Sequence, residues 1–224
     1  MSYATMHKAA VKFAKDAYAL EECNARLEKR KPRYGIMGAN CFHHPLDPVD
    51  AKRQYITDGT IGVCYDKGFA DLAVPPEDNP IDYARCLYIN PYYKGYEFQI
   101  AKLPDLVELK ELWKQERKRW SGWREKKYNI AYRLVAGDRR DNTVVVDITK
   151  LSLLMELMDC KGGETIKWYN AITPLFIDNV VSDRKVGEVR IEGFICPVRT
   201  VDTKKCLNDQ EESKVTYMWG RDGA

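Results

Sequence analysis

Apolar residues recur at helical spacing in two long stretches of the chain, and both predict α-helices. The first stretch, residues 4–30, is Ala-rich. Its apolar face would consist of Phe13, Ala17, Leu20 and Leu27. The second stretch, residues 103–120, places Pro104 in its first turn, a position that suits proline. Its apolar face would consist of Leu106, Leu109, Trp113 and Trp120.

A third, shorter helix is predicted directly after Asp147, whose side chain suits the N-cap position. We expect the helix to end at Gly162-Gly163, because glycine is common where helices stop. Its buried stripe would contain the apolar residues Ile148, Leu151 and Leu154, together with Met155 or Met158.

Between the helices, short runs rich in β-branched and aromatic residues predict strands. These runs are residues 33–42, YNIAYRLV (128–135), NTVVV (142–146), TIKWYN, PLFIDNVV and EVRIEGFICPVRT. The order is neither a regular β-α-β alternation nor an all-β pattern. It predicts an α+β fold in which helices pack on one face of antiparallel sheets. Residues 201–224 are polar and are expected to form a C-terminal tail.

The segment QYITDGTIGVCYD (54–66) has a polar interruption inside a strand-like run. Asp and Gly are poor strand residues, and Asp58-Gly59 is a strong signal for the tip of a β-hairpin. Asp58 then has two interpretations, a lone catalytic acid or a turn residue that bonds its own backbone. The second interpretation is the more common one for a single carboxylate in such a turn.

Composition, charge and cysteine content argue against several classes of protein. The 224 residues are 45% hydrophobic and 31% charged, as in globular domains, and no apolar run is long enough to span a membrane. Charged residues interrupt the N-terminal stretch where a signal peptide needs an apolar segment, so we expect an intracellular, cytoplasmic protein. The seven cysteines are widely spaced without a CxxC pair, which argues against a disulfide framework and a zinc ribbon.

Positive charge is concentrated in one segment, KQERKRWSGWREKK (114–127). It carries seven basic and two acidic residues, net +5, against +3 for the whole chain. Such a surface can contact DNA phosphates without reading sequence, although many charged helix faces are only solvated. The DNA-binding candidates are Lys110, Lys114, Arg117, Lys118, Arg124, Lys126 and Lys127. Trp113, Trp120 and Trp123 are candidates for stacking on bases, but their helical spacing favours the core.

A loop with Cys41, His43, His44 and Asp47 is the candidate metal site. Cys-x-His-His is not a usual zinc spacing, and no second cluster completes four ligands, so no metal is predicted. None of the common hydrolase, metalloprotease or nucleotide-binding motifs occurs, and the chain has three histidines. We therefore expect no enzymatic activity and no cofactor, with a metal-dependent enzyme built on Cys41, His43 and His44 as the weaker alternative.

Two separated stretches resemble one family. RYGIMGANCF followed by QYITDGTIGVCYD is similar to the strands "RYYLNG" and "ATDGxRLAV" of the bacterial sliding clamp, the β subunit of the replicative DNA polymerase. NTVVVDITKLSLLMELM, TIKWYNAITPLFID and EVRIEGFICPVRT resemble the closing strand-helix step and the last strands of that family. Order and spacing agree over residues 5–67 and 142–200, which is more than half of the chain.

The resemblance implies a site for short linear peptides of replication or repair proteins, walled by the TDG turn and the last strand. The positions that match are Thr57, Gly59, Thr60, Ile61, Gly62, Pro174, Cys196, Pro197, Val198 and Arg199. Two sets depart from the family: residues 60–62 replace His-Arg-Leu, and Cys196 and Val198 replace methionines. Because methionine is flexible, these replacements predict a smaller and stiffer pocket.

The resemblance also implies a domain organisation and a function. One expectation is a single clamp-like domain at 1–200 with an insertion at about 76–139, and the alternative is two compressed domains, 1–100 and 101–200. The implied function is a non-enzymatic, DNA-associated platform of bacterial, phage or mobile-element type, which needs a homo-oligomer to form a ring. The alternative is a clamp-fold interaction module that engages a protein, for example a host factor, without encircling DNA. No membrane partner is expected.

Overall fold

The computed structural model describes residues 3–30, 38–43, 52–58, 60–65, 97–119, 131–137, 143–184 and 187–198, together with Cys206. The helices are α1 (Tyr3–Leu27), α3 (Leu106–Arg119) and α4 (Ile148–Leu157). The strands are β1 (Gly38–His43), β2 (Lys52–Thr57), β3 (Ile61–Tyr65), β4 (Gln99–Lys102), β5 (Ala131–Val135), β6 (Thr143–Asp147), β7 (Thr165–Trp168), β8 (Leu175–Asp183) and β9 (Gly187–Ile195).

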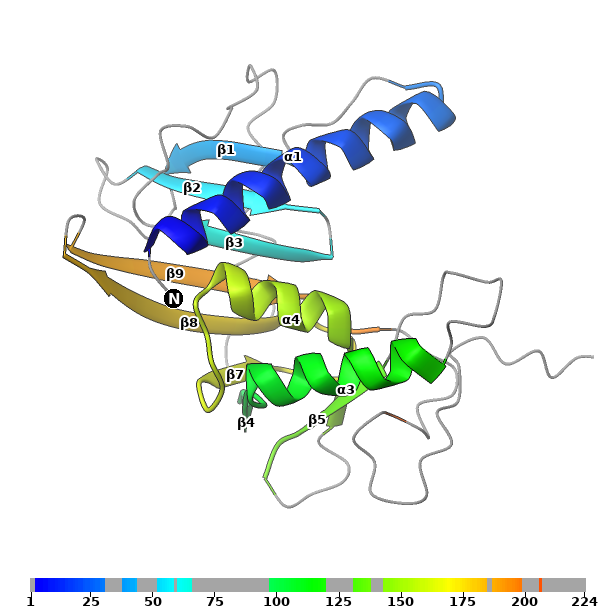
Figure 1. Ribbon diagram of the computed structural model, residues 1–224, viewed down its shortest axis with the longest axis vertical. Coiled ribbons are helices and arrows are strands. Elements are labelled where there is room, and N and C mark those ends of the chain that lie inside the picture. Colours follow the sequence, from blue (N-terminus) through cyan, green and yellow to red (C-terminus); the bar gives the residue numbers. More distant parts are fainter. Residues whose placement is uncertain are drawn as a thin grey trace, which may run out of the picture.

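Seven of these strands form one sheet in the order β1-β2-β3-β9-β8-β7-β4, and β5 and β6 form a separate pair (Figure 1). Every pairing in the described residues is antiparallel. The central pairing joins β3 to β9, with Val63 opposite Gly193. Strands far apart in sequence therefore meet in the middle of the sheet.

The order of elements repeats about this central pairing. A helix followed by three strands occurs as α1-β1-β2-β3 and again as α4-β7-β8-β9. Each set of three strands forms a meander, and the last strands of the two meanders pair with each other. The sequence has no fixed-period repeat, so this internal symmetry exists in the order and pairing of elements.

All three described helices lie on the same side of the seven-stranded sheet (Figure 1). Helix α1 packs against β1 and β2, α4 packs against β3 and β9, and α3 packs against α4. This arrangement confirms the predicted α+β fold with antiparallel sheets and helices on one face.

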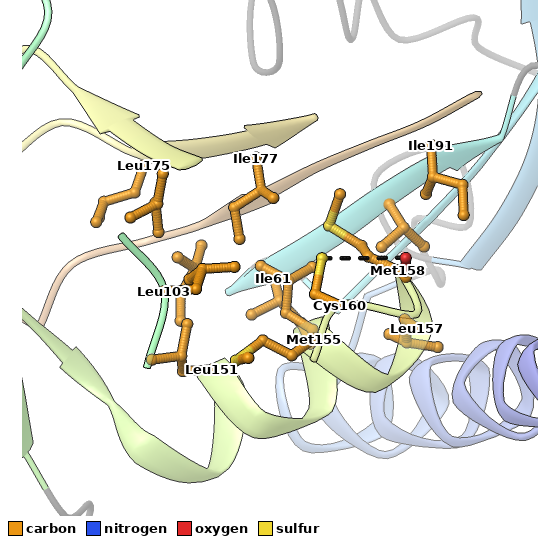
Figure 2. Close-up of a cluster of buried hydrophobic side chains, with 14 of the residues drawn as sticks. Ile61, Leu103, Leu151, Met155, Leu157, Met158, Cys160, Leu175, Ile177 and Ile191 are labelled. Carbon is orange, nitrogen blue, oxygen red and sulfur yellow. Dashed lines mark hydrogen bonds between the residues drawn. The ribbon is translucent and has the colours of Figure 1, made fainter. Parts of the chain in front are cut away.

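The core lies between α4 and the centre of the sheet (Figure 2). Gly193 lets the helix approach β9 closely: a Cβ there would lie 3.0 Å from Leu154 Cδ1 and closer still to the Met158 sulfur. The predicted stripe of α4 is buried at every position, and Tyr65 of β3 donates its hydroxyl to the Leu157 carbonyl at 2.9 Å. A buried tyrosine hydroxyl needs such a partner.

Helix α1 follows its predicted range but not all of its predicted apolar face. Met6, Ala10, Phe13 and Ala14 are buried, whereas Leu27 is 77% exposed. The prediction for Leu27 is wrong. The apolar spacing continues to the last turn of α1, but none of the described elements covers Leu27 there. The side chains of Ala17 and Leu20 lie outside the described residues.

Helix α3 begins at Leu106, three residues later than predicted. Asp105 caps it: one side-chain oxygen accepts from the backbone N–H of Val107 at 2.8 Å and of Glu108 at 3.0 Å. Pro104 therefore precedes the helix instead of occupying its first turn. An aspartate that satisfies two unpaired N–H groups defines the start of a helix more strongly than a nearby proline does.

Helix α4 ends at Leu157, before the predicted glycine pair. Asp159 adopts a left-handed conformation, φ 55°, and the N–H groups of Asp159 and Cys160 bond the carbonyls of Glu156 and Met155 at 3.3 and 2.9 Å. This pattern is a Schellman motif with aspartate in place of the usual glycine. Gly162 instead allows the loop after α4 to pack closely against the start of α3, since a Cβ there would lie 2.7 Å from Asp105 Cα.

Several predictions fall partly or wholly outside the described residues. Strand 33–42 is found as β1 over its second half, and residues 128–135 and 142–146 are found as β5 and β6. Within the region expected as an insertion, β4 pairs with β7 and α3 packs against α4. The domain boundaries stay a prediction. Cys206 is buried, and the rest of the predicted tail lies outside the described residues.

No described helix is both long and apolar enough to cross a lipid bilayer.

Candidate functional site

The TDG turn is a β-hairpin tip held by its own aspartate. Strands β2 and β3 pair with Thr57 opposite Gly62, which confirms the predicted hairpin. The Asp58 side-chain oxygen Oδ1 accepts from the N–H groups of Thr60 at 2.8 Å and Ile61 at 3.0 Å. The Thr57 hydroxyl donates to the Ile61 carbonyl at 2.7 Å. Asp58 therefore builds the turn, which favours its structural interpretation over that of a catalytic acid.

The second oxygen of Asp58 connects this turn to helix α4. Asp58 Oδ2 lies 2.5 Å from the Lys150 ammonium, and the Asp58 side chain is only 6% exposed. Lys150 stands in the first turn of α4, where a cation opposes the helix dipole. The carboxylates of Asp58 and of the N-cap Asp147 compensate for this, since Asp147 accepts from the N–H groups of Thr149 and Lys150. The polar kink in the strand thus anchors the hairpin to the helix.

The end of β9 lies beside the same turn. Ile61 pairs with Ile195, and the Cys196 N–H donates to the Thr60 carbonyl at 2.7 Å. Leu175, which follows Pro174, also faces Ile195 from the other side of β9. Of the ten predicted peptide-site residues, the eight that are described therefore gather at one end of the sheet. Gly59 and Arg199 lie outside the described residues.

These eight residues differ in how accessible they are. Ile61 is fully buried under α4 and Thr57 is 3% exposed. At Gly62 a Cβ would lie 2.9 Å from two atoms of the Phe194 ring and closer to a third. The room left by Gly62 therefore holds Phe194 instead of giving a ligand access to the backbone. The half-buried positions that can meet a ligand are Thr60, Pro174, Cys196, Pro197 and Val198.

The chain continues from this site to the two-stranded sheet. The N–H of Val198 donates to the Val145 carbonyl of β6 at 2.8 Å. Because β6 leads directly into α4, the segment after β9 and the start of α4 are held together. The TDG turn, the end of β9 and the start of α4 are thus one connected region.

Two of the predicted DNA-binding lysines on α3 form ion pairs with carboxylates of the protein. The Lys110 ammonium forms an ion pair with Glu156 of α4. Lys114 lies 3.5 Å from Glu111 one turn earlier. Arg117 and Lys118 are exposed near the end of the helix. Arg124, Lys126 and Lys127 lie outside the described residues, as do Trp120 and Trp123, while Trp113 packs against the core.

The candidate metal loop is only partly described. Cys41 and His43 belong to β1, and His44 and Asp47 lie outside the described residues. Within the part of the chain that is described, no group of three or more His, Cys, Asp or Glu side chains is arranged to hold a metal ion.

The five cysteines with described side chains form no disulfide, and one of them has a strongly shifted pKa. Burial raises the pKa of the Cys160 thiol to about 12, with smaller contributions from the nearby Glu164 and Asp159 carboxylates. Cys160 belongs to the core (Figure 2). Since the thiolate is the reactive form, this cysteine is inert at neutral pH.

The raised pKa of Cys160 predicts that the free energy of unfolding falls at alkaline pH. The unfolded thiol ionises near 9.0 and the folded one near 12, so ionisation favours the unfolded state between these values. The contribution of the protonated Cys160 thiol to the free energy of unfolding is fully present below pH 9 and is lost as pH rises. From pH 8 to pH 10, wild type should lose roughly 1 kcal/mol more unfolding free energy than Cys160→Ala. Urea unfolding at both pH values measures this, and an equal loss in both proteins would contradict it.

Sequence reasoning missed two features of this region. Lys150 gave no signal, because its importance depends on Asp58, which lies far away in the sequence. Lys8, Lys12 and Lys15 form an exposed row on α1. Their spacing of four and three residues places them on one side of the helix.

Comparisons with known proteins give little beyond this geometry. No protein-family model matches the chain, and no curated protein matches it. Among solved structures, the β clamp of H. pylori in complex with diflunisal is similar with a TM-score of 0.33 and 13% sequence identity. The match covers 66% of this chain and 42% of that one, so this chain spans less than half of the H. pylori protein. A TM-score this low does not support any inference about function.

Proposed function

We propose that this protein is a non-enzymatic, clamp-like binding platform that associates with duplex DNA in replication or another part of DNA metabolism. The observation that supports it best is the repeated order of a helix and three strands, joined through β3 and β9 into one sheet with helices on one face. The sequence resemblance implies a clamp-like domain, and a domain of that family consists of two α-β halves. Topology and motif positions together therefore support the proposal.

The peptide-site residues support the same proposal. The TDG turn and the Cys-Pro-Val segment after β9 are separated by more than a hundred residues, yet Cys196 bonds Thr60 directly. In the proposed function, the half-buried residues around this bond receive a short apolar peptide of a replication or repair protein. Small apolar walls with a few backbone polar groups suit such a ligand.

A second candidate function is a clamp-fold interaction module that does not encircle DNA. The ion pairs of Lys110 and Lys114 favour it, because an ammonium already paired with a carboxylate contributes less to phosphate binding. In this case the peptide-site region alone would carry the function. Both candidates place the protein in the cytoplasm and need no metal or cofactor.

The experiment that separates them is solution mass by light scattering, with and without nicked circular DNA. A clamp requires a closed oligomer, so its mass should be a small multiple of 25.9 kDa. Such a ring should be retained on circular DNA and released when the same DNA is linearised. A monomer that is not retained on either DNA would overturn the clamp and leave the interaction module.

A further inference from the structure

Lys150 is linked to the half-buried residues of the candidate peptide site through a short series of bonds. Its ammonium lies 2.5 Å from Asp58 Oδ2, and Asp58 Oδ1 accepts from the Thr60 N–H at 2.8 Å. The Thr60 carbonyl in turn accepts from the Cys196 N–H at 2.7 Å. The position of the TDG turn against the end of β9 is therefore connected to a side chain of α4.

A second series of bonds returns from the end of β9 to the same lysine. The Val198 N–H donates to the Val145 carbonyl of β6 at 2.8 Å. Strand β6 ends at Asp147, whose side chain accepts from the backbone N–H of Lys150 at 3.2 Å. The two series form a closed ring, and the segment 196–198 lies between its two attachments to Lys150.

The pair of Lys150 with Asp58 is unlike the other links of this ring. Each of the others uses a backbone group, whereas this one joins two side chains and two opposite charges. The Asp58 side chain is 6% exposed, and a carboxylate withdrawn from water to this extent needs a charged or hydrogen-bonding partner. The ring therefore depends on the ammonium of Lys150 at this one link.

Helix stability does not explain a lysine at position 150. It lies in the first turn of α4, where a cation opposes the helix dipole. The ion pair of Lys110 with Glu156 is a useful comparison, because both of its side chains are about one-third exposed and such pairs contribute little to stability. The contact with the buried Asp58 therefore accounts for Lys150 better than the helix does.

We propose that Lys150 is a positioning residue of the peptide site. It acts through Asp58, which holds Thr60 against Cys196 and so keeps the accessible residues Pro197 and Val198 in place. The inference rests on the proposed function, since the ligand is the short apolar peptide proposed above. Without the pair, the turn and the end of β9 separate more often, and a ligand then has to order both when it binds.

The first test is amide hydrogen exchange of the full chain. In Lys150→Met, the Cys196 N–H should exchange at least about tenfold faster than in wild type, beyond any acceleration at Ile191 in the centre of β9. Lys150→Arg keeps the charge and should restore slow exchange at Cys196. The matched control is Lys110→Met, which breaks an ion pair outside the ring and should leave Cys196 unchanged.

The second test measures the affinity of a fluorescein-labelled pentapeptide, Gly-Leu-Ser-Leu-Phe, by fluorescence anisotropy. Lys150→Met should bind it at least about tenfold more weakly than wild type, because the ligand has to order the two sides of the site. Lys150→Arg and Lys110→Met should bind it with an affinity close to that of wild type.

Three results would contradict the role of Lys150 while wild type still binds the peptide. One is unchanged exchange at Cys196 in Lys150→Met, and another is equal acceleration at Cys196 and Ile191, which indicates a general loss of stability. The third is faster exchange at Cys196 with wild-type affinity for the peptide. Failure of the wild-type protein to bind the peptide would instead overturn the peptide site of the proposed function, and the role of Lys150 with it.

Discussion

Replacing Asp58 by alanine is expected to lower the free energy of unfolding by about 3 kcal/mol. The carboxylate accepts from two backbone N–H groups of its own turn and pairs with Lys150. Alanine leaves these donors without their partner in a region that is largely buried, and each unsatisfied buried donor costs about 1–3 kcal/mol. Urea denaturation of wild type and variant measures the loss.

The matched control is Asp58→Asn, which keeps an oxygen for the turn and removes the negative charge facing Lys150. It should cost about 1 kcal/mol, less than the alanine variant. Combining Asp58→Asn with Lys150→Met should give less than the sum of the single losses, because both changes break the same pair. Equal destabilisation by alanine and asparagine would mean that the turn bonds contribute little.

Replacing Gly62 by valine is expected to destabilise the protein by about 3 kcal/mol, the upper part of the range for overpacking. The Cβ alone would overlap the Phe194 ring, which is itself 6% exposed and has little room to move. Valine is otherwise well suited to a strand, so propensity does not predict this loss. The readout is again the free energy of unfolding.

A double-mutant cycle with Phe194→Ala tests the cause. Removing the ring should relieve the clash, so that Gly62→Val costs much less in the Phe194→Ala background. Gly137→Ala is the control glycine: its φ is +60°, no atom lies within 4 Å of the added Cβ, and its cost should be only about 1 kcal/mol. That cost should not change in the Phe194→Ala background. Additivity of Gly62→Val and Phe194→Ala would contradict the clash.

These two experiments also separate structure from binding at the candidate peptide site. Asp58 and Gly62 hold the turn and the adjoining strands, so their substitution changes stability first. Substitutions at the half-buried positions, such as Pro197, leave those interactions intact. If a partner binds at this end of the sheet, its affinity should therefore fall in Pro197 variants whose melting temperature is unchanged.

The local elements of this protein were predictable from short stretches of sequence. The hairpin of β2 and β3 at Asp58, the N-cap at Asp147 and the apolar stripe of α4 all occur as expected. Each depends on interactions between residues a few positions apart, such as a side-chain oxygen that bonds a backbone N–H two or three residues later. Sequence spacing reports such interactions directly.

Element ends and accessibility were less predictable. The positive φ of Asp159 ends α4, and Asp105 starts α3, although glycine and proline nearby were the stronger sequence signals. Leu27 continues the apolar spacing of α1 and is nevertheless exposed. Spacing describes the face of a helix, but burial depends on whether another element reaches that part of the face.

The family resemblance implied that the TDG turn and the last strand meet, but only the tertiary structure decided which distant residues are in contact. The pairing of β3 with β9, the contact of Lys150 with Asp58 and the ring of Phe194 over Gly62 each join residues about 90 or more positions apart. Forming such contacts requires closing long loops, and the free energy that compensates comes from burial across the whole sheet. No local pattern carries that information. The sequence by itself therefore determined the existence of the helices, the hairpin and the Asp147 cap, and tertiary packing determined the remaining helix ends and the contacts within the site.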